Sequence, residues 1–285
     1  MVTVWSKHFM CVLSAVVLAG CKSGGSVSDI STNAPSFTAV DVLGQYQAEL
    51  VSSADPSQIT LLALNLKQNG NTISASKANV ILIGGTVSNN QITISTLGGA
   101  CDSGSLGGDS FAGSFTSPTN ATFTLSESQG GTASGQVTFS SDGTQIVSGS
   151  YSTPNQCGYA PDTGTITGTQ IQPFSGSYAG VLENSSGGQD AYIVTVTQTN
   201  SYLIISGTDN GAQITLTGSV VGGIFNVSGT IDGQQEQVFG LYDNTNNAFL
   251  VFNSLGLYVG TLSAGTNPQA VSKVPGMFAH TGWSH

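Results

Sequence analysis

The chain has 285 residues, of which 39% are hydrophobic and only 7% are charged, and its formal net charge is −10 at neutral pH. The hydrophobic content is sufficient for packed cores and excludes a disordered chain. The chain has no arginine and five lysines, so it lacks the clustered positive charge that a phosphate backbone requires, which excludes nucleic acid as a partner.

The N-terminal segment is apolar between residues 9 and 19 (FMCVLSAVVLA). This length matches the apolar region of a signal peptide and is too short to span a bilayer, which needs ~20 apolar residues. The run ends in LAGC (residues 18–21), which resembles the lipobox of bacterial lipoproteins. The resemblance implies that residues 1–20 are removed as a signal peptide. It also implies that Cys21 becomes the mature N-terminus and carries a diacylglycerol and an N-acyl chain such as palmitate.

The residues after Cys21 indicate how such an anchor is used. By the same resemblance, aspartate directly after the lipidated cysteine favours the inner membrane, whereas Lys22 favours the outer membrane. The folded part then faces either the periplasm or the cell surface. Residues 21–39 contain mainly Ser, Gly and other small or polar residues and predict a flexible, lipidated tether. The alternative is an ordinary cleaved signal peptide with a chance cysteine.

From about residue 40 the pattern is almost entirely β. In DAYIVTVTQ (190–198), Tyr192, Val194 and Val196 share one face of a strand, and threonines occupy the other. Dipeptides that tolerate positive φ separate such runs and predict hairpins of an antiparallel meander. They are Asn69-Gly70, Asn89-Asn90, Asp142-Gly143, Asn210-Gly211, Gly222-Gly223 and Asp232-Gly233.

The meander occurs twice along the chain. GQYQAEL (44–50) aligns with GSYAGVL (176–182), and in both copies a later strand ends in a glutamine before a turn. We therefore expect one domain at residues 40–170 and a second at residues 171–264, followed by a loose tail at 265–285. The first copy is longer because it contains an extra hairpin at residues 77–100.

Each copy has about eight strands, and a meander of that length can close on itself and remove its exposed edges. The predicted fold class is all-β, with two tandem antiparallel barrels or barrel-like sandwiches. We also expect the second barrel to be filled by large inward side chains. The expected inward set is Tyr178, Leu182, Tyr192, Val194, Val196, Ile214, Leu216, Phe225, Val227, Val238, Tyr242, Phe249, Val251, Leu257 and Val259.

The Gly-x-Tyr opening strands, the glutamine before a turn and the closing Gly-Thr strands resemble uncharacterised bacterial lipoproteins with calycin-like barrels. That resemblance implies an interior able to hold one small apolar molecule. Lipocalins and avidins have tryptophan in the first strand, where this chain has Tyr46 and Tyr178. The only tryptophans, Trp5 and Trp283, lie outside both copies.

Four cysteines are present, and Cys11 is removed with the expected signal peptide while Cys21 is the expected lipidation site. Cys101 and Cys157 remain as an even pair in an oxidising compartment, which predicts a disulfide. The alternatives are a metal ligand or a catalytic thiol. A metal site would need nearby histidine or a Cys-x-x-Cys spacing, and neither is present.

The candidate catalytic residues do not occur in the chain order of a known catalytic triad. GGDSF (107–111) resembles the Gly-Asp-Ser of chymotrypsin-like proteases and of esterases, but the only upstream histidine is His8, and His280 and His285 lie in the tail. We interpret Asp109-Ser110 as a polar turn before a strand. Four glutamates remain available as carboxylate pairs for glycoside cleavage. They are Glu49, Glu127, Glu183 and Glu236.

Three classes of function fit these observations. The first is a lipid-anchored envelope or surface lipoprotein with a non-catalytic binding or structural role, whose partner is a protein, a glycan or a small apolar ligand. The second is a calycin-like carrier of a small apolar ligand, and the third is a carbohydrate-active hydrolase. We expect the first, with no enzymatic activity, no metal and no cofactor.

Overall fold

The computed structural model of the chain describes residues 37–88, 91–98, 101, 108–184, 187–244, 246–252 and 258–267. The expected signal peptide, Cys21, most of the tether and the tail after residue 267 lie outside these ranges. Within them the secondary structure consists of β-strands and one short 3-10 helix, η1 (Lys77–Asn79). No helix among the described residues is long and apolar enough to cross a membrane.

The first barrel is a ring of eight strands, because β1 pairs with β10 on one side and with β2 on the other. The ring runs in the order β1-β10-β9-β8-β7-β6-β3-β2. Its strands are β1 (Gly44–Ser52), β2 (Gln58–Asn69), β3 (Thr72–Ala75), β6 (Ser110–Phe115), β7 (Asn120–Ser126), β8 (Thr132–Phe139), β9 (Gln145–Thr153) and β10 (Asp162–Ile171).

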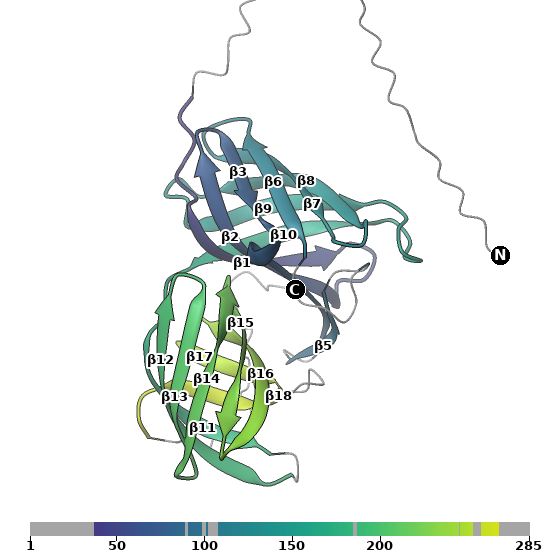
Figure 1. The fold of residues 1–285 in the computed structure, drawn as a ribbon. Helices are drawn as coiled ribbons and strands as arrows, with labels where there is room; N and C mark the ends of the chain where they lie inside the picture. Colours follow the sequence, from purple (N-terminus) through teal and green to yellow (C-terminus); the bar gives the residue numbers. More distant parts are fainter. Residues whose placement is uncertain are drawn as a thin grey trace, which may run out of the picture. The chain divides into compact units, whose positions relative to one another are not determined.

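The extra hairpin of the first copy is confirmed and branches from β2 (Figure 1). It consists of β4 (Val80–Ser88) and β5 (Gln91–Leu97). The first part of β2, from Gln58 to Leu64, pairs with β4, whereas the last residues, Lys67 to Asn69, pair with β3. The sheet thus forks along one long strand, and the hairpin extends it without interrupting the ring.

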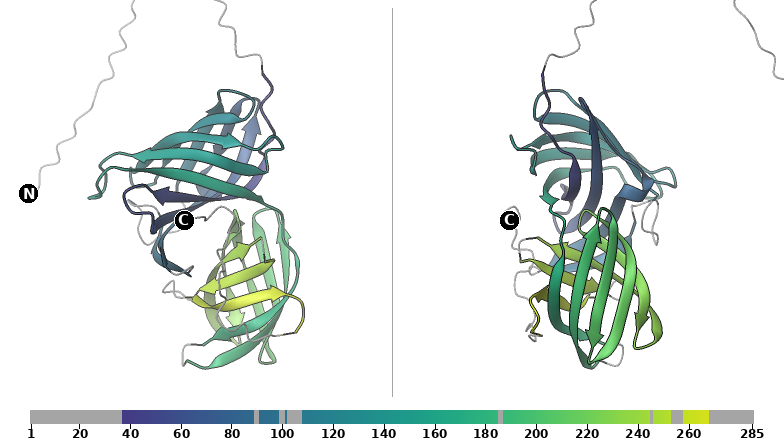
Figure 2. Two further views of the ribbon diagram at one scale, coloured as in Figure 1. Left: turned by 180° about the vertical axis from the view of Figure 1, so that it is seen from behind. Right: turned by 60° about the vertical axis from the view of Figure 1, so that its left-hand side comes forward.

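The second barrel is a closed eight-stranded meander in which each strand pairs with the next and β18 returns to β11 (Figures 1 and 2). The predicted fold class, with about eight strands per copy, is therefore confirmed. Its strands are β11 (Gly176–Glu183), β12 (Gln189–Thr199), β13 (Tyr202–Asp209), β14 (Ala212–Val221), β15 (Ile224–Ile231), β16 (Gln234–Asp243), β17 (Ala248–Phe252) and β18 (Tyr258–Ala264).

The glutamine shared by the two copies has the same structural role in both. In the first barrel the Gln68 amide accepts a hydrogen bond from Val42 N (2.8 Å) and donates one to Val40 O (2.9 Å). In the second, the Gln198 side chain accepts one from Phe174 N (3.0 Å). Each glutamine therefore holds the segment that precedes its first strand, which explains why a polar residue recurs at that point of the repeat.

Apolar side chains form three buried clusters. One lies inside each barrel, and the third consists of outward-facing residues from both barrels. The two barrels belong to one compact unit. The shared cluster comprises Ile59, Leu61, Ala63, Ile81, Ile83, Val221, Ile224, Phe239, Leu241, Leu250 and Phe252. Strands β2, β4, β16 and β17 accordingly contain near-continuous apolar runs, since both of their faces are buried.

Candidate functional site

One end of the second barrel is closed by aromatic rings. Phe249 packs edge-to-face on Tyr178 and Phe174, with centroid separations of 4.5 Å and 5.1 Å, and Phe174 stacks on Tyr242 at 4.2 Å. Both phenols donate to the side-chain oxygen of Asn247, Tyr178 at 3.0 Å and Tyr242 at 2.8 Å. The buried hydroxyls are thus satisfied, and packed aromatic rings occupy this end of the barrel.

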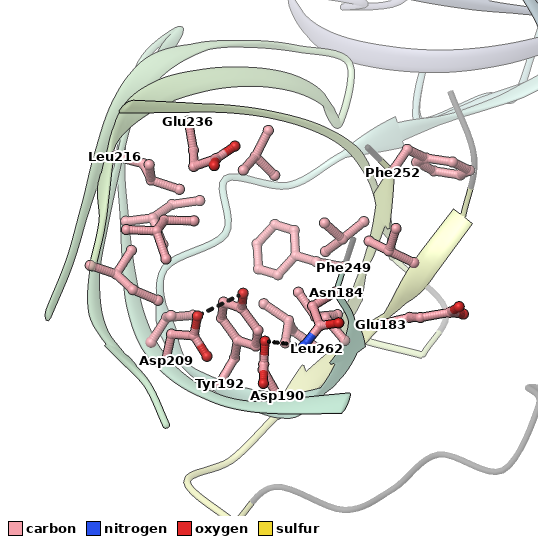
Figure 3. Close-up of a pocket in the computed structure, with 18 of the residues that line it drawn as sticks. Glu183, Asn184, Asp190, Tyr192, Asp209, Leu216, Glu236, Phe249, Phe252 and Leu262 are labelled. Carbon is pink, nitrogen blue, oxygen red and sulfur yellow. Dashed lines mark hydrogen bonds between the residues drawn. The ribbon is translucent and has the colours of Figure 1, made fainter. Parts of the chain in front are cut away.

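The other end contains a cavity of about 820 Å³ (Figure 3). Its deep wall is apolar, while residues at the rim, such as Gln234 and Glu236, are exposed to solvent. The apolar lining includes Val194, Val196, Ile205, Ile214, Leu216, Phe225, Phe249, Val251 and Leu262. The prediction of a barrel filled throughout is therefore wrong, since side chains fill it at the aromatic end only.

Inward glycines reduce the side-chain volume inside the second barrel. Nearly all of the expected inward side chains do belong to the core cluster or pack against it, and Leu257 lies outside the described residues. Because side chains alternate along a strand, glycines share the inward face with these residues and contribute no volume. A Cβ on Gly207 would lie only 2.1 Å from Ile193 O, and one on Gly218 the same distance from Asn226 O. Backbone approaches this close require glycine, so the count of large residues overestimated the filled volume.

Three inward rows of apolar side chains end in a carboxylate at the cavity rim. Asp190 directly precedes the apolar row on β12, Asp209 follows the row on β13, and Glu236 precedes the row on β16. The signal for this arrangement is in the sequence, since DAYIVTV places Asp190 on the same face as Tyr192 and Val194. The predicted inward set contained only apolar and aromatic residues and therefore did not include this carboxylate.

The two aspartate carboxylates differ in the number of hydrogen bonds that they accept from the protein. Asp190 accepts hydrogen bonds from Asn184 Nδ2 (3.0 Å) and Asn210 Nδ2 (2.6 Å). Asp209 lies opposite Tyr192 in the sheet and accepts one bond from its hydroxyl at 3.1 Å, through Oδ2 (Figure 3). The other oxygen, Oδ1, is buried and has no hydrogen-bond partner among the described residues.

Burial raises the pKa of the Asp209 carboxyl, and the nearby charges of Asp190 and Asp232 raise it further, against the opposing effect of the Tyr192 hydrogen bond. Burial, followed by the charge of Asp209, likewise raises the pKa of the Tyr192 hydroxyl. The cavity rim is therefore a region of negative potential in which additional negative charge is unfavourable.

The four candidate glutamates are distributed over the fold. Glu183 and Glu236 both line the cavity, but Glu183 points away from it in Figure 3. Glu127 accepts a hydrogen bond from Cys101 N at 2.7 Å in the first barrel. Glu49 is buried on β1, and its burial raises the pKa of its carboxyl to about 8. The structure thus brings two of the four to one cavity.

Cys101 and Cys157 are joined by a disulfide in the structure, with their Cα atoms 5.3 Å apart. Asp109 lies immediately before β6, and its carboxylate accepts a hydrogen bond from Ser128 N at 3.2 Å. The pair therefore leads into a strand, as interpreted, but Asp109 is buried and the structure has no turn at these two residues. Among the described residues, no three His, Cys, Asp or Glu side chains converge to hold a metal ion.

Comparison with known proteins found no matching family model and no matching curated protein. Two solved structures are similar to part of the chain. One is a redesigned β barrel, mFAP1, bound to DFHBI, with 12% identity and a TM-score of 0.28. The other is EF1p2_mFAP2b bound to DFHBI, with 12% identity and a TM-score of 0.30. In each case the match covers 46% of this chain and 94% of the other.

Proposed function

We propose that this protein is a lipid-anchored binding protein of the cell envelope, and that its second barrel binds one small, mainly apolar molecule without transforming it. The observation that carries the proposal is the cavity of about 820 Å³ with an apolar wall and a solvent-exposed polar rim. Ligand sites typically have volumes of about 300–1,000 Å³ and combine an apolar lining with a few polar groups. The cavity fits this description in both size and composition.

The division of the barrel supports binding rather than a purely structural role. The aromatic rings around Phe249 and the hydrogen bonds to Asn247 close one end. They supply the packing that stabilises the barrel, so the other end is free to remain unfilled. A molecule that enters past the rim would meet Val194, Ile214 and Leu216, whose apolar surface favours an apolar group.

The proposal is tested with N-phenylnaphthylamine, an uncharged apolar fluorophore whose emission rises in a dry site. We expect one equivalent to bind the purified protein, and we expect Leu216→Trp to weaken binding at least about tenfold because the indole occupies the cavity. Titration of the fluorescence measures both. Thr215→Trp is the matched control, since Thr215 is exposed on the same strand and points outward.

If the wild type takes up no fluorophore, or if both tryptophan variants bind it equally well, the cavity is not the binding site. Thermal unfolding of each variant verifies that the barrel is folded.

The anchor is the second part of the proposal and is supported by LAGC at residues 18–21, which follows a run too short to span a bilayer. Two or three acyl chains, at ~0.8 kcal/mol per buried methylene, hold a protein on a membrane essentially permanently. We expect Cys21→Ser to abolish lipid attachment and to release the protein from the membrane fraction. Mass spectrometry and fractionation measure this. A Cys21→Ser protein that remained membrane-bound after a high-salt wash would contradict the anchor.

A further inference from the structure

We infer that the cavity of the second barrel selects a molecule with an apolar body and a protonated amine at one end, the amine lying at the rim against Asp209. This inference rests on the proposed function and specifies the class of ligand. The apolar body follows from the cavity wall described above. The cationic end follows from three further observations.

The first observation is that several residues at the cavity rim are acidic. Asp190, Asp209 and Glu236 all line the cavity, and in Figure 3 Glu236 lies on a different side of it from the two aspartates. Asp232, in the turn between β15 and β16, adds a further negative charge that acts on Asp209. A group that enters the cavity therefore passes carboxylates from β12, β13 and β16.

The second observation is that the second barrel supplies no counter-charge of its own. Residues 171–264 contain six acidic residues and no lysine, arginine or histidine. The described lysines, Lys67 and Lys77, belong to the first barrel. Carboxylates that are partly removed from water normally require a cation or several hydrogen-bond donors. A protonated amine would provide both.

The third observation identifies which carboxylate has capacity left. Asp190 already accepts hydrogen bonds from two asparagine amides, whereas Asp209 accepts one from Tyr192 and has a buried, unpartnered Oδ1 among the described residues. An ammonium group carries three donors. One of them can bond the Asp209 carboxylate once the side chain turns the shielded Oδ1 toward the cavity, and a charge-assisted bond of this kind is about twice as strong as a neutral one.

The same potential excludes anions. A carboxylate-bearing ligand such as a fatty acid would place its charge beside Asp209 and Asp190, which like-charge repulsion disfavours. An alcohol with the same apolar body would keep the burial of apolar surface but would lack the charge. Three ligands that share one body and differ in the terminal group therefore separate the contribution of the charge from that of the cavity.

The experiment measures displacement of N-phenylnaphthylamine by naphthylethylamine, naphthylethanol and naphthylacetate at neutral pH. We expect the amine to bind at least about tenfold more tightly than the alcohol and the acetate to bind most weakly. In Asp209→Asn, which preserves shape and removes the charge, the preference for the amine over the alcohol should fall below about threefold. The loss of preference should come mainly from weaker binding of the amine.

Asp55→Asn is the matched control, because it changes the net charge equally at an exposed turn of the first barrel. It should leave the preference for the amine unchanged. Equal binding of amine and alcohol to the wild type, or an unchanged preference in Asp209→Asn, would overturn the inference and leave the proposed function intact. If none of the three compounds, nor the fluorophore, binds the wild type, both are overturned.

Discussion

Replacing Phe249 by alanine is expected to lower the free energy of unfolding by about 3–5 kcal/mol, as measured by chemical denaturation. Phe249 is 1% exposed, and its ring contacts four other aromatic rings. They are Phe174, Tyr178, Phe225 and Tyr242. Removing the central ring takes away the surface against which the others pack, and it leaves a void that the closed sheet cannot collapse to fill.

Leu216→Ala is the comparison for this prediction. Leu216 is also buried and, like Phe249, lines the cavity, but it is not one of the packed aromatic rings, so its removal mainly enlarges a space that already exists. We expect it to cost about 2 kcal/mol, the lower end of the range for leucine. If Phe249→Ala cost no more than Leu216→Ala, the aromatic end would not be the part of the second barrel that stabilises it.

Removing the disulfide is the other change with a large expected effect. Cys101 and Cys157 are 56 positions apart, and a closed loop of that length stabilises the folded state by about 4 kcal/mol in the chain-entropy model. We expect the double variant Cys101→Ala/Cys157→Ala to melt roughly 10 °C below the wild type, as measured by calorimetry. The double substitution avoids leaving a reactive free thiol.

Reduced wild-type protein is the control, and it should melt at the temperature of the double variant. Non-reducing peptide mapping should recover Cys101 and Cys157 in one linked peptide pair. Two free thiols in protein that was kept under oxidising conditions, or an unchanged melting temperature in the double variant, would refute the stabilising role of this bridge.

Local sequence features predicted the strands and hairpins well. The β14–β15 and β15–β16 connections fall at Gly222-Gly223 and Asp232-Gly233, and the first residue of each pair has positive φ. The glutamines that end strands at equivalent places in the two copies are explained by one hydrogen-bonding role. These features are visible in the chain because turn chemistry and side-chain alternation act over a few residues.

The candidate site was only partly predictable. The alternation that places Val194 and Val196 inside the barrel also places Asp190 there. The pairing of Tyr192 with Asp209 requires the register of β12 against β13, which joins residues on different strands. The unpartnered Oδ1 of Asp209 depends on every group around it, so no local pattern indicates it.

The sequence by itself determined the all-β class, the duplication, the inserted hairpin and the identity of most inward side chains, because each follows from short-range alternation and from turn residues. Only the tertiary structure decided that the second barrel is closed by aromatic rings at one end and hollow at the other. The free volume inside a closed barrel is the volume that the strands enclose minus the summed volume of the inward side chains of all eight strands. Inward glycines change both quantities at once: they remove side-chain volume and let neighbouring strands approach, so the outcome depends on the whole ring.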